Sequence, residues 1–180
     1  MSVRTPSQTI GPFFHVGLKW DAGDKVPFAG QGERITLTGR IYDGAGAPIA
    51  DALLESWQAD ASGAAPGEGD ALRACGAGRV ATDAEGRYRL ETAMPGASRG
   101  AGGETYVPQI SITIFARGLL KAVRTRVLLA SAAEAQSDPL ARAAGARAGT
   151  LIARRDSADA SLWHWDVRLQ GAQETAFIAL

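Results

Sequence analysis

The chain has 180 residues, with 19 basic and 19 acidic side chains, 22 glycines and one cysteine. This length fits a single domain, large enough to bury a hydrophobic core without disulfide bonds. The net charge of zero argues against nucleic acid as a main partner, because phosphate binding needs an excess of Lys and Arg. The single cysteine, Cys75, excludes a disulfide framework and a cysteine-based metal cluster.

The sequence gives no sign of a membrane segment or of an export signal. No apolar run approaches the ~18–20 residues that a membrane helix needs. The N-terminus lacks an apolar core followed by a small-residue cleavage site. We therefore expect a cytoplasmic protein with no membrane partner.

Residues 1–32 combine Gly and Pro with aromatic side chains and show no helical period. The aromatic residues are Phe13, Phe14, Trp20 and Phe28. Such a segment is typical of an arm that covers an apolar surface, either on its own domain or on a partner chain. We expect residues 33–180 to form the folded domain.

Alternation of apolar and polar residues predicts strands along most of this domain. Residues 34–42 show the period of two, and 106–117 show it most strongly, with Ile110, Ile112 and Ile114 on one face. Further strands are predicted at 49–58, 79–82, 87–92, 122–129, 150–155 and 162–169. Short strands separated by turns predict an all-β fold, an antiparallel sandwich.

One short helix is expected as an insertion between strands, within residues 131–148. Ser137 or Asp138 can cap it, and Pro139 suits a first helical position. Residues 60–78 and 95–103 lack periodicity and are expected to be loops.

Searches for familiar catalytic motifs are negative. The sequence contains neither a phosphate-binding GxxxxGK[ST] loop, nor GxGxxG after a strand, nor a GxSxG elbow. Cys75 lies in a predicted loop far from either histidine, which favours an unreactive thiol. His15 and His164 are far apart, so we do not expect them to share a metal, and His164 suits a strand face.

Arg117 is the last residue of the most apolar predicted strand. A guanidinium at a strand end can offer two parallel hydrogen bonds to a carboxylate, although a solvated charge is the simpler interpretation. Arg124 and Arg126 share one strand face, and there a solvated surface is the expectation.

Several segments resemble the intradiol ring-cleavage dioxygenases. The most specific are the arm motif TPSQTxGPF and the motif LxGRxYDGxGxPxxDxxxExWQADxxG. The matching segments are 5–18, 37–63, 83–96, 107–119, 125–129 and 166–180. The resemblance implies a transthyretin-like or prealbumin-like β-sandwich, in agreement with the predicted strands. It also implies a non-haem ferric iron held by two tyrosines and two histidines.

The positions of those four ligands are vacant in this sequence. The His-x-His pair corresponds to Gln109 and Ser111, which share a strand face but are poor ligands for Fe³⁺. The tyrosine positions fall at 64–66 and 97–99, where the chain reads Ala-Ala-Pro and Ala-Ser-Arg. Tyr106 is too close to the Gln109 strand to replace a ligand from the preceding loop. We expect no metal and no catalytic residue in this chain alone.

The vacant positions fit the iron-free member of a hetero-oligomer. The resemblance implies that a homologous beta chain binds Fe³⁺ and that the active site lies at the contact between the chains. This chain would lend Thr9, Gly11, Pro12 and Arg117 to the pocket for a catechol carboxylate. The reaction implied is insertion of both atoms of O₂ between the two hydroxylated ring carbons.

Three other functions stay open. A non-enzymatic sandwich module, of the carboxypeptidase-regulatory or carbohydrate-binding type, would have no need of the arm. A stand-alone intradiol enzyme would need the missing ligands. A degenerate paralogue would have lost its partner, although the arm motif and Arg117 are retained.

Overall fold

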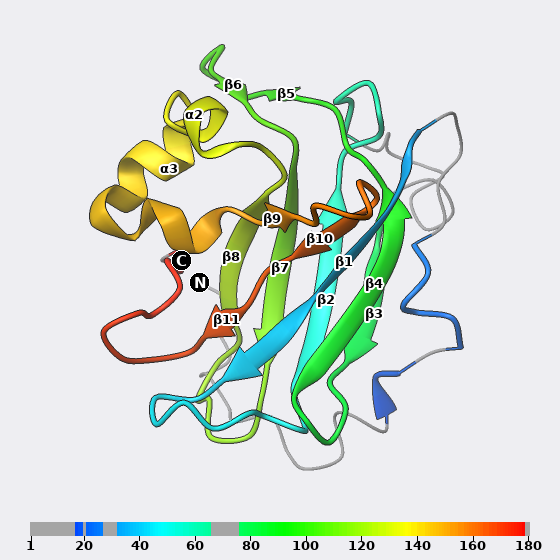
Figure 1. Cartoon of the computed structure of the whole chain (residues 1–180), viewed down its shortest axis with the longest axis vertical. Helices are drawn as coiled ribbons and strands as arrows, with labels where there is room; N and C mark the ends of the chain where they lie inside the picture. The colour runs from blue at the N-terminus through cyan, green and yellow to red at the C-terminus, as the bar shows by residue number, and fades with distance from the viewer. Residues whose placement is uncertain (1–16, 20, 27–31, 66–75, 179–180) are drawn as a thin grey trace, which may run out of the picture.

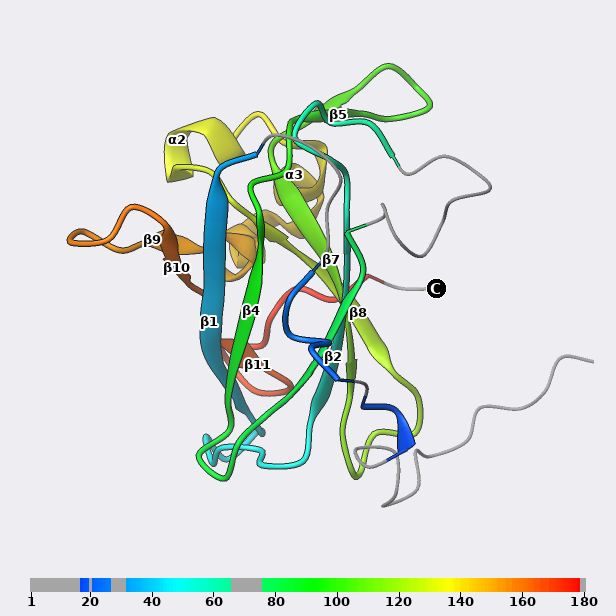
Figure 2. The ribbon, with the colours of Figure 1, turned by 90° about the vertical axis from the view of Figure 1, so that its right-hand side faces the viewer.

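The computed structural model describes residues 17–19, 21–26, 32–65 and 76–178. Most of its described strands form two packed sheets, seen edge-on in Figure 2, and Ser98–Arg99 pairs with Thr105–Tyr106 in a separate hairpin. The first sheet contains β1 (Arg34–Tyr42), β4 (Arg87–Ala93), β9 (Arg154–Arg155), β10 (Leu162–His164) and β11 (Val167–Arg168). The second has the order β3 (Gly78–Ala81), β2 (Leu53–Gln58), β7 (Gln109–Phe115), β8 (Val123–Leu128). The predicted β-sandwich is thereby confirmed.

The core lies between the two sheets and follows from the alternation in the sequence. On β7 every second side chain is buried, and Ile110, Ile112 and Ile114 are at most 2% exposed. Leu37 of β1 and Leu90 of β4 meet them from the first sheet. The strands predicted at 34–42 and within 106–117 are therefore confirmed, because burial of one strand face fixes the register of the whole strand.

Strand direction in the first sheet differs from the prediction. β4 pairs with β1 in antiparallel fashion, but β10 and β11 run parallel to β1 along its other edge. The cause is the helical insertion, which returns the chain to the end of the sandwich where β1 begins (Figure 1). The predicted strand 150–155 shortens to β9, and the strand 162–169 is interrupted at Trp165 and Asp166.

That interruption packs against Gly39 in the middle of β1. A Cβ atom at Gly39 would lie 1.8 Å from the carbonyl oxygen of Trp165, so only glycine fits there. The buried hydroxyl of Tyr88 donates a hydrogen bond of 2.6 Å to the same oxygen. Burial raises the pKa of Tyr88 well above its ordinary value, so the phenol keeps the proton that it donates.

The insertion contains more than the one predicted helix. It has two short α-helices, α2 (Ala132–Ala135) and α3 (Pro139–Ala144), followed by a 3₁₀ helix, η1 (Gly145–Leu151). Asp138 caps α3 and Pro139 takes its first position, as predicted. The second carboxylate oxygen of Asp138 accepts a hydrogen bond from the Val107 amide at 3.0 Å, which ties α3 to the strand connection before β7.

Part of the predicted arm packs on its own sandwich. The amide of Val26 donates to the carbonyl of Glu91 on β4, and the Arg79 amide on β3 donates to Gly23. Val26 is buried in the core. Residues 21–26 therefore bridge the edges of the two sheets. Among the described residues, no helix has the length and apolar character needed to cross a bilayer.

We expect Tyr88→Phe to lower the free energy of unfolding by about 1–3 kcal/mol, because the buried Trp165 carbonyl loses its hydroxyl donor. Urea denaturation of the variant and the unchanged chain measures this difference. Tyr42→Phe is the matched control, since Tyr42 is also on the first sheet and contacts Arg168 through its ring. If both variants lost the same free energy of unfolding, the stabilising role of the Tyr88 hydroxyl would be contradicted.

We expect Asp138→Asn to destabilise the chain by about 1–3 kcal/mol. One carboxylate oxygen accepts from the start of α3 and the other from Val107, so an amide must direct its NH₂ group at a backbone donor. Thermal unfolding of the variant and of the unchanged chain measures this loss of stability. A melting temperature as high as that of the unchanged chain would show that the second hydrogen bond contributes nothing.

Candidate functional site

The outer face of the second sheet carries the residues that correspond to the family's histidine ligands. Gln109 and Ser111 alternate with the buried isoleucines of β7 and so point away from the core. Ser111 is directly opposite Trp57 on β2 and Arg126 on β8. These three residues form a row across the sheet, near the end where β7 begins.

A cavity of about 310 Å³ covers this row. Its walls are the ends of β2, β7 and β8, the loop after β2, and the hairpin of β5 (Ser98–Arg99) and β6 (Thr105–Tyr106). The lining residues are Trp57, Gln58, Ala59, Gly63, Ala65, Gly96, Ser98, Arg99, Gly100, Tyr106, Gln109, Ser111 and Arg126.

Two loops meet at one side of the cavity without intervening side chains. Gly63 has a φ of +84°, and a Cβ there would lie 1.9 Å from the Ala97 carbonyl oxygen. Asp60 holds the first loop in place by accepting hydrogen bonds from the Ser62 hydroxyl and from two backbone amides. The hydrogen bond from the Ser62 hydroxyl is the main cause of a lowered pKa for Asp60.

The structure brings all four predicted ligand positions to this one cavity. Gln109 and Ser111 line it from β7, Ala65 from the loop after β2, and Ser98 and Arg99 from β5. Pro66 lies outside the described residues. The fold thus brings positions that are distant in sequence to one cavity.

The side chains that line the cavity do not fit a ferric ion. Gln109 and Ser111 offer a neutral amide and a hydroxyl, and Tyr106 is the single phenol among the described lining residues, whereas Fe³⁺ needs several imidazole, phenolate or carboxylate ligands. Two arginines, Arg99 and Arg126, add positive charge beside any cation. The described residues contain no group of three or more His, Cys, Asp or Glu that could hold a metal.

Three of the cavity residues are not among those that the sequence predicts as functional. The sequence predicts only a solvated strand face for Arg126, Arg99 falls at a vacant tyrosine position, and Tyr106 is too close to the Gln109 strand to replace a ligand. In the structure the Arg126 guanidinium carbon lies 5.7 Å from the centre of the Tyr106 ring. The strand alternation did place Arg126 and Ser111 on outward faces, but only the hairpin's position shows that Arg99 and Tyr106 join them.

Arg117 lies at the opposite end of the sandwich from the cavity. It follows β7, whose seven residues alone span about 20 Å. Its side chain is 70% exposed, and its Nε atom forms an ion pair with the Asp51 carboxylate just before β2. The structure therefore does not bring Arg117 together with Gln109 and Ser111.

The predicted arm residues Thr9, Gly11 and Pro12 lie outside the described residues, as do His15 and Cys75. Residues 17–19, which follow the first group, are described, and the Leu18 carbonyl accepts a hydrogen bond of 2.6 Å from Arg79. In Figures 1 and 2 this dark blue segment lies toward the same lower end as the β7–β8 connection that carries Arg117.

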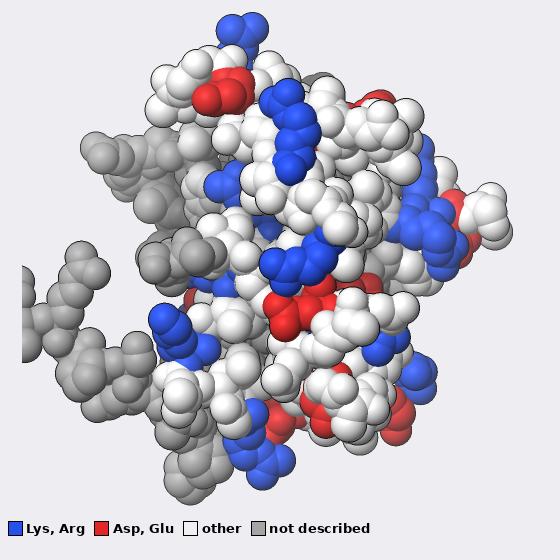
Figure 3. All heavy atoms as spheres, turned by 90° about the vertical axis from the view of Figure 1, so that its left-hand side faces the viewer, with Lys and Arg blue, Asp and Glu red and all other residues white. Residues whose placement is uncertain are grey.

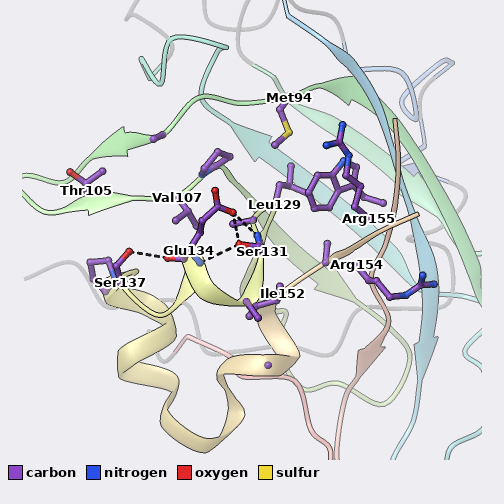
Figure 4. A pocket seen from close by; sticks show the side chains of 18 of the residues that line it. Met94, Thr105, Val107, Leu129, Ser131, Glu134, Ser137, Ile152, Arg154 and Arg155 are labelled. Carbon is purple, nitrogen blue, oxygen red and sulfur yellow. Dashed lines mark hydrogen bonds between the residues drawn. The ribbon is translucent and has the colours of Figure 1, made fainter. Parts of the chain in front are cut away.

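A larger groove of about 1180 Å³ lies between α2 and β9 (Figure 4). Its walls are mainly apolar, with Met94, Val107 and Leu129 among them. The Glu134 carboxylate closes a capping box with Ser131 at the start of α2 and so points inward to the backbone. Of the residues predicted from the sequence as functional, those that the structure describes do not line this groove.

The surface gives no sign of a nucleic-acid interface on the face that carries α2 and α3. Figure 3 shows Lys and Arg scattered there among acidic and uncharged residues. His164 lies on β10, as predicted, with its Nε2 atom 3.1 Å from the Asp156 carboxylate in the adjacent turn. That contact is a local strand–turn interaction.

Comparisons with known proteins show the family to which the chain belongs. A family model described as "Dioxygenase" matches residues 11–171. The protocatechuate 3,4-dioxygenase alpha chain of Pseudomonas putida is 36% identical over 192 residues, which cover 97% of this chain and 95% of that protein. The corresponding beta chain of Burkholderia cepacia is 41% identical over 97 residues, 51% of this chain and 40% of that protein.

A solved structure supports the fold independently. It is the dioxygenase domain of a dioxygenase carbohydrate-binding protein fusion from Streptomyces sp. SirexAA-E, with a TM-score of 0.61 at 21% identity. The match covers 93% of this chain and 100% of that one. The chain therefore belongs to the dioxygenase family, and along nearly its whole length it is related to the alpha chain of protocatechuate 3,4-dioxygenase.

Proposed function

We propose that this chain is the iron-free alpha subunit of a protocatechuate 3,4-dioxygenase. In this assembly a homologous beta chain holds Fe³⁺, and the two chains form one substrate pocket. The reaction is O₂-dependent intradiol cleavage of protocatechuate to 3-carboxy-cis,cis-muconate. The isolated chain is inactive, and its cytoplasmic location stays a prediction.

The observation that carries this proposal is the combination of full-length similarity with an unsuitable set of donors. The chain is similar to an alpha chain from end to end, and it is also similar to a beta chain over half its length. Its own cavity offers Gln109, Ser111 and two arginines where a ferric site needs anionic or imidazole ligands. A subunit that acts through its partner's metal accounts for both facts.

The arm and Arg117 are the parts that we assign to the shared pocket. Gly11 and Pro12 form a backbone segment with little side-chain bulk, which can approach a flat ring closely. Thr9 adds a hydroxyl group. Residues 17–19, which follow these arm residues in the chain, lie toward the same end of the sandwich as the β7–β8 connection (Figure 2). Arg117 belongs to that connection, and this supports a joint role.

Arg117 is suited to bind the carboxylate of the substrate. The Asp51 carboxylate contacts its Nε atom, which orients the guanidinium and leaves the terminal nitrogens for a second carboxylate. The exposed side chain is accessible to a partner-bound ligand. In this role Arg117 orients the ring without taking part in the oxidation, and orientation alone can lower a barrier by several kcal/mol.

The second candidate function is a non-enzymatic sandwich module. The large apolar groove beside α2 would suit binding, and such a module needs no metal. End-to-end similarity to a dioxygenase subunit, arm included, favours the enzyme assembly.

We expect the purified chain to contain no stoichiometric iron and to cleave no catechol, and to support cleavage once combined with its beta chain. The reason is the donor set of its cavity. Metal analysis, native mass spectrometry and oxygen consumption measure these properties. A purple-red chain that is active alone would overturn the proposal, and a metal-free chain that pairs with no second subunit would favour the binding module.

We expect Arg117→Ala, in the assembled enzyme, to raise KM for protocatechuate about tenfold, which corresponds to about 1.4 kcal/mol of binding free energy. The KM for plain catechol should rise less, because catechol has no carboxylate to pair with Arg117. Steady-state kinetics with both substrates measures the difference.

Arg124→Ala is the matched control, since Arg124 is an exposed arginine on the neighbouring strand β8. An equal rise in KM for protocatechuate and for catechol would show that Arg117 acts only by pairing with Asp51. An effect of Arg124→Ala as large as that of Arg117→Ala would point to general surface charge.

A further inference from the structure

The cavity on the second sheet has a positive character that the proposed function does not use. Arg99 and Arg126 both line it, and none of the described lining residues is Asp or Glu. Neither arginine is within ion-pair distance of a described carboxylate. Two guanidinium groups that share a small cavity without a counter-charge favour an anion between them.

Arg126 is held in place without losing its charge. Its guanidinium lies 5.7 Å from the centre of the Tyr106 ring, and an aromatic face restrains a cation but does not neutralise it. On its other side it is directly opposite Ser111 in the strand register. The N–H groups of Arg126 therefore remain available to a ligand.

Polar groups complete the lining. Ser111 and Tyr106 supply hydroxyl groups that can donate to an anion. The Oε1 atom of Gln109 is buried, and no described group donates a hydrogen bond to it. A buried acceptor without a partner is costly, so we expect an ordered water molecule that donates to Gln109 and also contacts the bound ligand.

We propose that this cavity binds a small oxyanion, either an inorganic one or the carboxylate of a small organic acid. Its volume of about 310 Å³ is at the lower end of ligand-binding cavities, which limits the ligand to about one ring. Trp57 forms one wall and offers an aromatic face to such a ring. The site lies at the opposite end of the strand from Arg117 and is separate from the shared pocket.

Isothermal titration calorimetry of the full chain, in the assembly in which it is purified, tests the proposal. The probes are sodium benzoate, inorganic phosphate and neutral benzamide, at low ionic strength. We expect one benzoate or phosphate per chain and no binding of benzamide. Preference for benzoate identifies an organic carboxylate, and preference for phosphate identifies an inorganic oxyanion.

Substitutions assign the binding to this cavity. Arg126→Gln should weaken binding at least tenfold, whereas Arg124→Gln, two residues away on β8 and outside the cavity, should leave it unchanged. Ser111→Asp should abolish binding by placing a carboxylate opposite Arg126. If Arg126→Gln fails to fold, Arg99→Gln on the exposed hairpin replaces it.

The same titration in Arg117→Ala separates this site from the shared pocket. Binding that persists in Arg117→Ala and is lost in Arg126→Gln belongs to the cavity. Absence of binding by both anions at millimolar concentration would overturn the proposal, as would equal affinities of Arg126→Gln and Arg124→Gln. Neither result bears on ring cleavage by the assembled enzyme.

Discussion

The close approach of the Trp165 carbonyl to Gly39 is the constraint on which the sandwich depends. It lets the C-terminal segment change from β10 to β11 while it stays beside β1. Tyr88 satisfies that carbonyl from β4, on the other edge of β1, and the Trp165 indole donates to the Thr150 carbonyl in η1. One short stretch thus joins four strands of the first sheet, β1, β4, β10 and β11, and the helical insertion.

The place of the site and its chemistry have separate physical causes. Burial of Ile110, Ile112 and Ile114 forces Gln109 and Ser111 outward, whatever their side chains are. The core therefore fixes the positions of these outward residues, and their chemistry can differ between members of one fold without cost to the core.

Local patterns predicted much of this structure, and tertiary contacts explain what they missed. The strands at Arg34–Tyr42 and Gln109–Phe115 follow from strict alternation, and the cap at Asp138 from helix-end chemistry. The parallel direction of β10 depends on where the helical insertion returns the chain, which alternation does not encode. Likewise, Arg99 reaches the cavity because Gly63 and Gly96 let two loops touch, a contact between segments far apart in sequence.

The two arginines also bear on how metal is distributed between homologous subunits. Under the proposed function, two chains of one fold are made together, and only one of them should receive Fe³⁺. Loss of ligands lowers the affinity of this chain for iron, and the positive charge of Arg99 and Arg126 adds repulsion in a confined space. An anion bound between them would fill the remaining volume. Under both proposals, the residues that form the oxyanion site also disfavour iron in this chain and so favour its binding by the partner.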